Sequence, residues 1–428
     1  MGRSRKEFMN LLSTYEKFNQ TNPAAGALAS FRQAAFDYAS KKGLPTRKDE
    51  DWHYTSVKAL GEANFAPSAL NPVQPSHETM TEIQKILNPE FTNIVFFNGV
   101  LNKTLSSELP AGFTLRELSE YPTMFHDSFD ALNGAYMTKP FALTLAKETS
   151  VEKPVNFVFF TSSEGGPALM VHPRIRLDVG NRSSVRVLES HYGKANTTYF
   201  VNSVFDLHVA DNAKVTYVRV QAESESAINI GRTRITLQKD ATVESMAFAT
   251  GASLSRHSLD VLLKGFGSNA EVLGVYATHG KQHVDNTTVI DHQVGTCNTN
   301  QLYKGILDGE SKAAFVGKVL IQKDAQKANS AQLNNNLLLS SKAEADSKPC
   351  LEIYADDVKA AHGSTVGQLN REELFYLLSR AIPKKQAIPM LSYGFLSEVI
   401  YKISDETIQH WLTRHLDEAF KRLHVESH

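Results

Sequence analysis

Helical spacing of apolar residues marks both ends of the chain. Near the N-terminus, apolar side chains recur at steps of three and four residues, which places them on one helix face: Phe8, Leu11, Leu12 and Tyr15. The same spacing returns after residue 369 and predicts a last helix through Trp411 and Phe420. We therefore expect a mainly helical N-terminal domain over residues 1–140 and a C-terminal helical domain over residues 369–428.

Between these ends, from residue 141 to 368, short apolar runs alternate with clusters of Gly, Asn, Asp and Ser, which is typical of strands and turns. Four valines follow a turn-like cluster at steps of 30, 28 and 29 residues: Val185, Val215, Val243 and Val272. A second set of runs, starting at Val204, Arg234, Asp260 and Ile290, has nearly the same period. Two strands per repeat without a helix predict a parallel β-solenoid core, with a β-sandwich as the alternative.

The repeat is less regular after residue 280, although the runs from Ala313, Asn334 and Cys350 still indicate strands. A solenoid exposes unpaired backbone and apolar core at its ends, so an end has to be capped or joined to another surface. The last strand-like stretch, Leu351–Gly367, is followed at once by a helical pattern. We expect it to form the last coil.

This last stretch also holds the most suggestive polar residues. Asp356 and Asp357 are adjacent, and adjacent strand residues face opposite ways, so they are expected to cap a turn or meet a partner rather than act as an acid pair. His362 is flanked by small residues that leave its imidazole uncrowded. Neutral imidazole is a good ligand for iron or zinc, which makes His362 a candidate metal ligand.

Composition narrows the function classes. The chain has 45 basic and 46 acidic residues and 42% hydrophobic residues, so neither nucleic acid nor an anionic membrane is an expected partner. No window approaches 18 consecutive apolar residues and no signal-peptide pattern is visible, so the expected localisation is cytoplasmic. Two cysteines, Cys297 and Cys350, provide neither a disulfide framework nor a four-thiolate cluster site.

Other candidate sites are weak. No P-loop and no G-x-S-x-G motif is present. His279 and His283 are four residues apart, but they lack the helix and the glutamate of a zinc motif. A positive charge near a cysteine favours the reactive thiolate, and Lys348 is the only such hint near Cys350. Cys297 lies in a turn-like segment. Trp52 is expected to anchor a charged surface loop.

Two long segments resemble a known family. Residues 333–400, with the run LEIYADDVKAAHGSTVGQLNREELFYLLSRAI, resemble the signature region of the SufB/SufD family of iron–sulfur cluster assembly proteins. Residues 45–60, PTRKDEDWHYTSVKAL, resemble the N-terminal hallmark of its SufD branch. The resemblance implies a right-handed parallel β-helix between helical domains, and a non-catalytic scaffold in a SufB–SufC–SufD complex.

The resemblance also implies partners. A SufB-like subunit, or a second copy in a homodimer, would pair through the end of the β-helix, where Asp356, Asp357 and His362 lie. A SufC-like ATPase would dock on the C-terminal helices, for which we select four apolar residues: Leu391, Phe395, Leu396 and Val399.

The same resemblance implies that His362 helps to build a transient iron–sulfur cluster at the SufB interface, with no cofactor bound by the isolated chain. Ala360 stands where some relatives have a cysteine. No flavin motif is visible, although complexes of this family are associated with reduced flavin. A β-helix enzyme acting on polysaccharide and a purely structural partner without metal contact are the alternatives.

Overall fold

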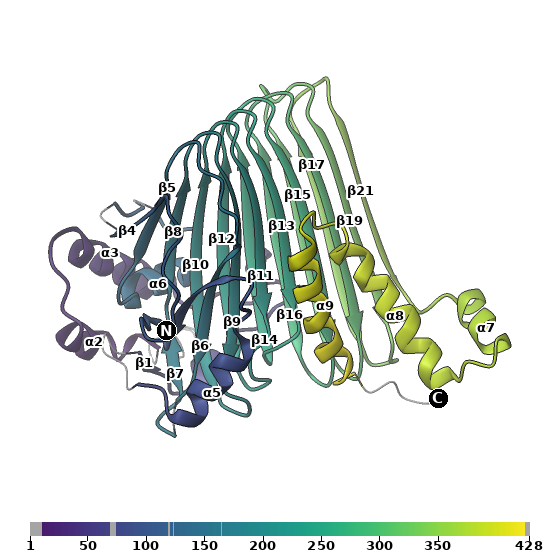
Figure 1. Ribbon diagram of the computed structural model, residues 1–428, viewed down its shortest axis with the longest axis horizontal. Coiled ribbons are helices and arrows are strands. Elements are labelled where there is room, and N and C mark those ends of the chain that lie inside the picture. Colours follow the sequence, from purple (N-terminus) through teal and green to yellow (C-terminus); the bar gives the residue numbers. More distant parts are fainter. Residues whose placement is uncertain (1–10, 69–73, 119, 123, 164, 424–428) are drawn as a thin grey trace.

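A computed structural model describes residues 11–68, 74–118, 120–122, 124–163 and 165–423. Two large sheets face each other and form a parallel β-solenoid of about seven turns over residues 155–367, which confirms the predicted fold class (Figure 1). Phe8 of the predicted first apolar stripe lies outside the described residues.

The solenoid alternates strands between the two sheets. Sheet A contains β1 (Ala66–Pro67), β4 (Phe113–Glu117), β5 (Phe141–Leu145), β7 (Leu169–Val171), β8 (Arg174–Val179), β10 (Tyr199–Val209), β12 (Ile228–Leu237), β14 (Leu254–Leu263), β16 (His283–His292), β18 (Lys312–Ile321) and β20 (Glu344–Ile353). Sheet B contains β2 (Thr92–Phe97), β3 (Val100–Leu101), β6 (Val155–Thr161), β9 (Ser184–Gly193), β11 (Lys214–Gln221), β13 (Thr242–Ala249), β15 (Asn269–Thr278), β17 (Asn298–Leu307), β19 (Asn329–Leu338) and β21 (Lys359–Gly367).

The two strand sets predicted from the sequence are the two sheets. Val185, Val215 and Val243 are register partners on β9, β11 and β13. The parallel pairing continues through β19 and β21, so the coils persist where the sequence repeat weakens. The repeated turn has a structural reason. Asn212 and Asp240 adopt left-handed backbone, with φ of 58° and 53°, which these short polar side chains tolerate best among non-glycine residues.

Tyrosines and glycines fill the solenoid interior in complementary pairs. Tyr303 lies over Gly274 of the preceding coil, and Tyr276 lies over Gly305 of the following coil. All four sit in register on β15 and β17, and both tyrosines are fully buried. Each ring therefore occupies the space that a side chain on its partner strand would need.

We expect Gly305→Ala to lower the free energy of unfolding by about 1–3 kcal/mol, because the new methyl group would overlap the Tyr276 ring in a packed interior. Urea unfolding followed by circular dichroism measures this change. Gly367→Ala is the matched control, since nothing lies within 4 Å of the added methyl group. Equal stability of both variants would show that the interior adapts to the extra atom.

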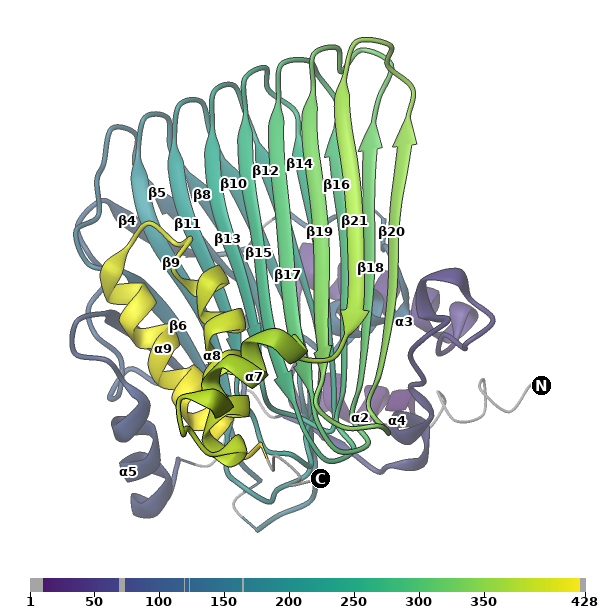
Figure 2. The ribbon, with the colours of Figure 1, turned by 90° about the vertical axis from the view of Figure 1, so that its right-hand side faces the viewer.

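Helices cover the outer faces of both sheets (Figures 1 and 2). Among the described residues, five N-terminal helices lie beside sheet A: α2 (Tyr15–Thr21), α3 (Gly26–Lys42), the short 3-10 helix η1 (Glu50–Trp52), α4 (Lys58–Glu62) and α6 (Ser128–Tyr136). A further helix, α5 (His77–Ile86), lies near the first coils. The C-terminal helices α8 (Lys384–Ile400) and α9 (Glu406–Phe420) pack on sheet B, preceded by α7 (Arg371–Ser379). None of the helices within the described ranges is long and apolar enough to cross a membrane.

The segment with residues 45–60 fastens the N-terminal helices to sheet A. Trp52 is buried, with its ring 4.0 Å below the guanidinium of Arg256 on β14. Thr55 donates a hydrogen bond to Asp285 on β16, and Glu50 pairs with Lys348 on β20 at 3.0 Å. The predicted aromatic anchor is confirmed, and the segment spans four coils up to the last one.

Candidate functional site

The solenoid ends at two strands that each lack a second neighbour. β20 pairs with β18 and β21 pairs with β19, and no other described strand continues either sheet. Both edges are about ten residues long, and large apolar side chains are exposed on or beside them: Leu333, Ile353, Tyr354 and Val366. A long edge with exposed apolar groups is a template for pairing with another chain.

His362 lies in the middle of this edge. It is the register partner of Gln332 on β19, and side chains at one register position of a parallel pair point to the same side. Gln332 is buried inside the solenoid, and Ala360 packs against the same core. His362 therefore faces the interior from the last coil, but it is exposed because no coil covers it.

Asp356 and Asp357 lie in the turn between β20 and β21, as the sequence indicated. The backbone N–H of Asp357 donates to Gln326 of the preceding coil at 2.9 Å, and both side chains are exposed. His362 follows Asp357 by five residues of extended chain, which corresponds to roughly 16 Å. The structure thus does not bring the two carboxylates to the imidazole.

The two cysteines lie apart from His362. Cys297 is fully buried in a turn, with its Sγ 3.4 Å from the Gly295 carbonyl oxygen. Cys350 faces outward on β20, because its register partner Lys318 belongs to the outward set of β18. Lys318 and Lys348 beside it pair with glutamates, at 2.6 and 3.0 Å. Cys350 and His362 thus point to different sides of the last coil.

The interior just below His362 is polar, which sequence reasoning missed. Gln332 donates to Gln301 at 2.6 Å, and Gln301 donates to Thr288 at 2.8 Å. The sequence does contain a signal for these inward amides. In the run QLNNN, every second residue is an amide, and the two-residue period of a strand places Gln332, Asn334 and Asn336 on the inward face. Inward amides can stack from coil to coil because each finds a partner on the neighbouring coil.

A second polar cluster lies in the middle coils and is closed. Glu189 contacts His191 at 2.6 Å and Arg219 at 3.7 Å, and it accepts a hydrogen bond from Tyr217. Burial raises the pKa of Glu189, but the hydrogen bond from His191 and the nearby positive charges outweigh it and hold the pKa at about 2. This cluster is a buried network centred on the Glu189 carboxylate, and within the described residues His191 Nδ1 and Arg219 Nε have no hydrogen-bond partner.

The remaining histidines do not assemble a metal site. His283 bonds to Thr55 at 2.9 Å, whereas His279 approaches Glu225 at 3.3 Å, so the two have separate partners. His172 is stacked on Tyr136, and burial lowers its pKa to about 3. Across the described ranges, no three His, Cys, Asp or Glu residues are grouped so that they could hold a metal ion.

The C-terminal helices require a correction. Leu396 and Val399 are fully buried in the apolar cluster that joins α8 and α9 to sheet B. Leu391 and Phe395 are half-buried, and the ring of Phe395 lies 4.5 Å from the Lys304 ammonium group. The apolar stripe predicted for partner docking therefore mainly attaches the helix to its own solenoid. Pro389 lies inside α8, where the carbonyl that it leaves without a donor belongs to exposed Lys385.

In contrast, α7 projects from the body of the molecule and has no buried residue (Figure 1). Phe375 is 71% exposed, and Tyr376 and Leu378 on the same helix are also exposed. Met390 adds an exposed apolar side chain from α8. An exposed apolar helix beside a packed helical pair is typical of a protein-binding surface.

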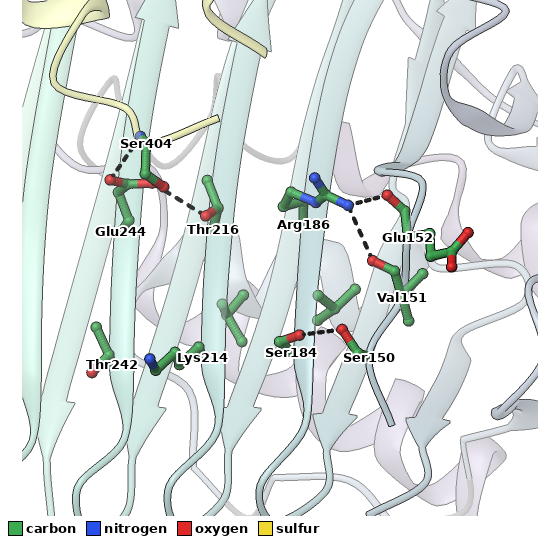
Figure 3. Close-up of a pocket in the computed structure, with 12 residues that line it drawn as sticks. Ser150, Val151, Glu152, Ser184, Arg186, Lys214, Thr216, Thr242, Glu244 and Ser404 are labelled. Atoms are coloured by element: carbon green, nitrogen blue, oxygen red, sulfur yellow. Dashed lines mark hydrogen bonds between the residues drawn. The ribbon is translucent and has the colours of Figure 1, made fainter. Parts of the chain in front are cut away.

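A pocket of about 440 Å³, lined mostly by polar and charged residues, lies on the outer face of β9, β11 and β13, below Ser404 (Figure 3). Its arginine, Arg186, pairs with Asp405 and donates to the carbonyls of Val151 and Glu152. Its Glu244 accepts hydrogen bonds from Ser404. Arg186 and Glu244 thus attach the start of α9 to the sheet. Because Glu244 is engaged in this attachment, the pocket does not present the pair of free carboxylates that glycoside hydrolysis requires.

Comparisons with known proteins agree with this architecture. Residues 159–395 match the SufBD core domain of the SUF system for FeS cluster assembly, and residues 2–157 match the SufBD protein N-terminal region. A SufBD family protein of Synechocystis is 32% identical over 89% of this chain and 89% of its own length. The Escherichia coli iron–sulfur cluster assembly protein SufD is 30% identical over 86% of this chain and 88% of its own length. SufD of Bacillus subtilis is 30% identical over 68% of this chain and 66% of its own length.

These matches confirm the family that the two sequence segments indicated. The two family matches cover the N-terminal part, the solenoid, α7 and most of α8. The chain belongs to the SufBD family of iron–sulfur cluster assembly proteins.

Proposed function

We propose that this chain is a non-catalytic scaffold subunit that pairs through the open end of its solenoid with a SufB-like subunit. The observation that carries the proposal is the edge formed by β20 and β21, with His362 at its centre. In such a pair the partner's last coil would continue the two sheets and cover the exposed apolar residues. A second copy of this chain could occupy the same edge when no SufB-like subunit is present.

His362 would supply one ligand for iron or for a nascent cluster, which is the cargo of the complex. Within the described ranges, no metal-binding group of three side chains surrounds it. One imidazole does not complete a coordination sphere, so the partner would provide the remaining ligands. This division explains why neither Cys297 nor Cys350 needs to lie near the imidazole.

A SufC-like ATPase would bind the exposed face of α7 and the neighbouring part of α8. The chain itself contains no P-loop, so nucleotide hydrolysis would belong to that partner. Phe375 and Tyr376 are the proposed contact residues in place of buried Leu396 and Val399.

We expect His362→Ala to leave the thermal unfolding of the isolated chain unchanged, because the side chain is exposed. The same variant should lower the cluster formed in the assembled complex at least tenfold, the usual scale for loss of a metal-site residue. Co-expression with a SufB-like subunit and a SufC-like ATPase, followed by anaerobic reconstitution with iron and sulfide, measures this.

His410→Ala is the matched control, since His410 is an exposed histidine on α9, away from the edge. Normal cluster yield in His362→Ala would exclude the ligand role and leave a purely structural partner. Failure of the wild-type chain to co-purify with either subunit would exclude the scaffold function itself.

A further inference from the structure

A ladder of hydrogen-bonded amides runs through the solenoid interior and ends directly below His362. Thr288 accepts from Gln301 Nε2 at 2.8 Å, and Gln301 Oε1 accepts from Gln332 Nε2 at 2.6 Å. These three residues are buried, with at most 3% exposure. Gln301 donates across the interior to β16, whereas Gln332 donates to its register partner Gln301 on the preceding coil. With its Nε2 directed to the preceding coil, Gln332 has its carbonyl oxygen left for the following one.

The last oxygen of this ladder has no partner. Gln332 Oε1 is buried and accepts no hydrogen bond within the described part of the chain. The residue in register with Gln332 on the following coil is His362. A buried acceptor without a donor has lost its hydrogen bonds to water and gained none, so a donor next to it is favoured. The imidazole carries an N–H that can fill this role.

The opposite sheet makes room for this arrangement. Gly317 on β18 faces the Gln332 amide across the interior, and a methyl group at Gly317 would overlap Gln332 Nε2. A second overlap would occur with the Phe315 ring, at 2.8 Å. The amide therefore reaches its position only because residue 317 has no side chain.

We propose that Gln332 is a positioning residue whose free Oε1 accepts a hydrogen bond from one ring nitrogen of His362 when the exposed imidazole turns onto it, and so fixes the tautomer of the imidazole. A neutral imidazole has one donor and one acceptor nitrogen, and a bond to one nitrogen decides which electron pair remains for a ligand. With Gln332 accepting from the inside, the other nitrogen presents its lone pair toward the open end of the solenoid. This inference rests on the proposed role of His362 in cluster assembly.

Nitrogen NMR of the histidine rings tests the pairing in the isolated chain, without any cluster. At about pH 8.5, two units above the ordinary histidine pKa of about 6.5, one-bond and long-range ¹⁵N shifts distinguish the two neutral tautomers. The His362 signals are assigned by their loss in His362→Ala. We expect a single tautomer in the wild-type chain and a mixture in Gln332→Met, which keeps the side-chain length but has no amide acceptor.

Gly317→Ala is a second test that retains every polar group while it displaces the amide and crowds the Phe315 ring, so it should also produce mixed tautomers. Asn334→Leu is the control, because it removes another buried interior amide on β19 while leaving Gln332 in place. A wild-type tautomer ratio in both Gln332→Met and Gly317→Ala would overturn the proposal. Mixed tautomers in Asn334→Leu would also overturn it, since the effect would then reflect general loosening of the last coils.

Cluster yield in the assembled complex separates this inference from the function on which it rests. We expect Gln332→Met to lower the yield about tenfold, the scale for residues that orient a ligand. The double variant with His362→Ala should be no worse than His362→Ala alone, because both changes act through one imidazole. Altered tautomers with normal cluster yield in His362→Ala would keep the hydrogen bond and reject the ligand role.

Discussion

Asp130→Asn is expected to lower the free energy of unfolding by about 3 kcal/mol, because it removes the negative charge from a buried ion network. Asp130 lies on α6 and is fully buried, with its carboxylate 3.3 Å from Arg174 on β8 and 3.1 Å from Arg234 on β12. Asparagine keeps the shape of the side chain but leaves these guanidinium groups undercompensated. Thermal or urea unfolding at pH 7 measures the loss.

The network joins the N-terminal helices to the solenoid. Asp206 on β10 pairs with Arg234 at 2.5 Å and with Arg174 at 3.6 Å. Arg232 bridges Asp127, which caps α6, to Asp260 on β14, at 2.8 and 2.6 Å. Four sheet strands thus share charges with one helix. Loss of a single carboxylate should loosen the attachment of α6 as well as the local pair.

The same variant has a defined pH dependence. Burial by itself raises the pKa of Asp130, but the positive charges of Arg174 and Arg234 outweigh it and hold the pKa well below its usual range. A depressed folded-state pKa gives stability that is complete above the unfolded-state value of about 3.9 and is lost as pH falls through the folded-state value. The stability difference between wild type and Asp130→Asn should therefore be constant above about pH 5 and shrink below about pH 4.

Glu148→Gln is the control for this experiment. Glu148 pairs with Arg182 on the surface, where both side chains are more than half exposed. An exposed pair of this kind contributes about 0–1 kcal/mol, so this variant should hardly change stability. A loss below about 1 kcal/mol in Asp130→Asn, or a difference that does not shrink in acid, would contradict the buried-network interpretation.

The sequence was sufficient to predict the solenoid because the repeat has a physical cause at identifiable residues. Val185, Val215 and Val243 form one inward column, and a left-handed turn residue with a buried alanine precedes both Val215 and Val243. The placement of His362 on the last strand followed from the change to helical spacing after Gly367. These features depend on local spacing, which a single sequence displays.

Features that depend on pairing between distant residues could not be predicted in the same way. Asp130 contacts Arg174 and Arg234 only in the folded solenoid, because these residues are far apart in the sequence. No local sequence pattern therefore predicts the ion network. The apolar stripe of α8 has the same spacing whether it covers its own sheet or a partner. Leu396 and Val399 turned out to cover the sheet, because outward side chains of β15 and β17 below them are also apolar. The exposed surface of α7 was therefore missed.

The exposed surface of α7 is the basis for a second large expected effect, a loss of ATPase binding. Phe375→Asp is expected to weaken binding of a SufC-like ATPase about 100-fold, because it replaces an exposed aromatic anchor by a charge that would be desolvated in the interface. Phe375 is 71% exposed on a helix without buried residues, and Leu378 lies one turn along the same face. A 100-fold change corresponds to about 2.8 kcal/mol of binding free energy. Isothermal titration of the purified chain with the ATPase measures it.

Phe266→Asp is the matched control, since Phe266 is 57% exposed and lies in the turn between β14 and β15. The two variants introduce the same charge at exposed phenylalanines, so any general effect of the charge on solubility or folding should be shared. Equal affinity of Phe375→Asp and wild type would remove α7 from the docking surface. Loss of binding in Phe375→Asp alone, with unchanged pairing to the SufB-like subunit, would separate the two surfaces: α7 for the ATPase, and the β20–β21 edge for the scaffold partner.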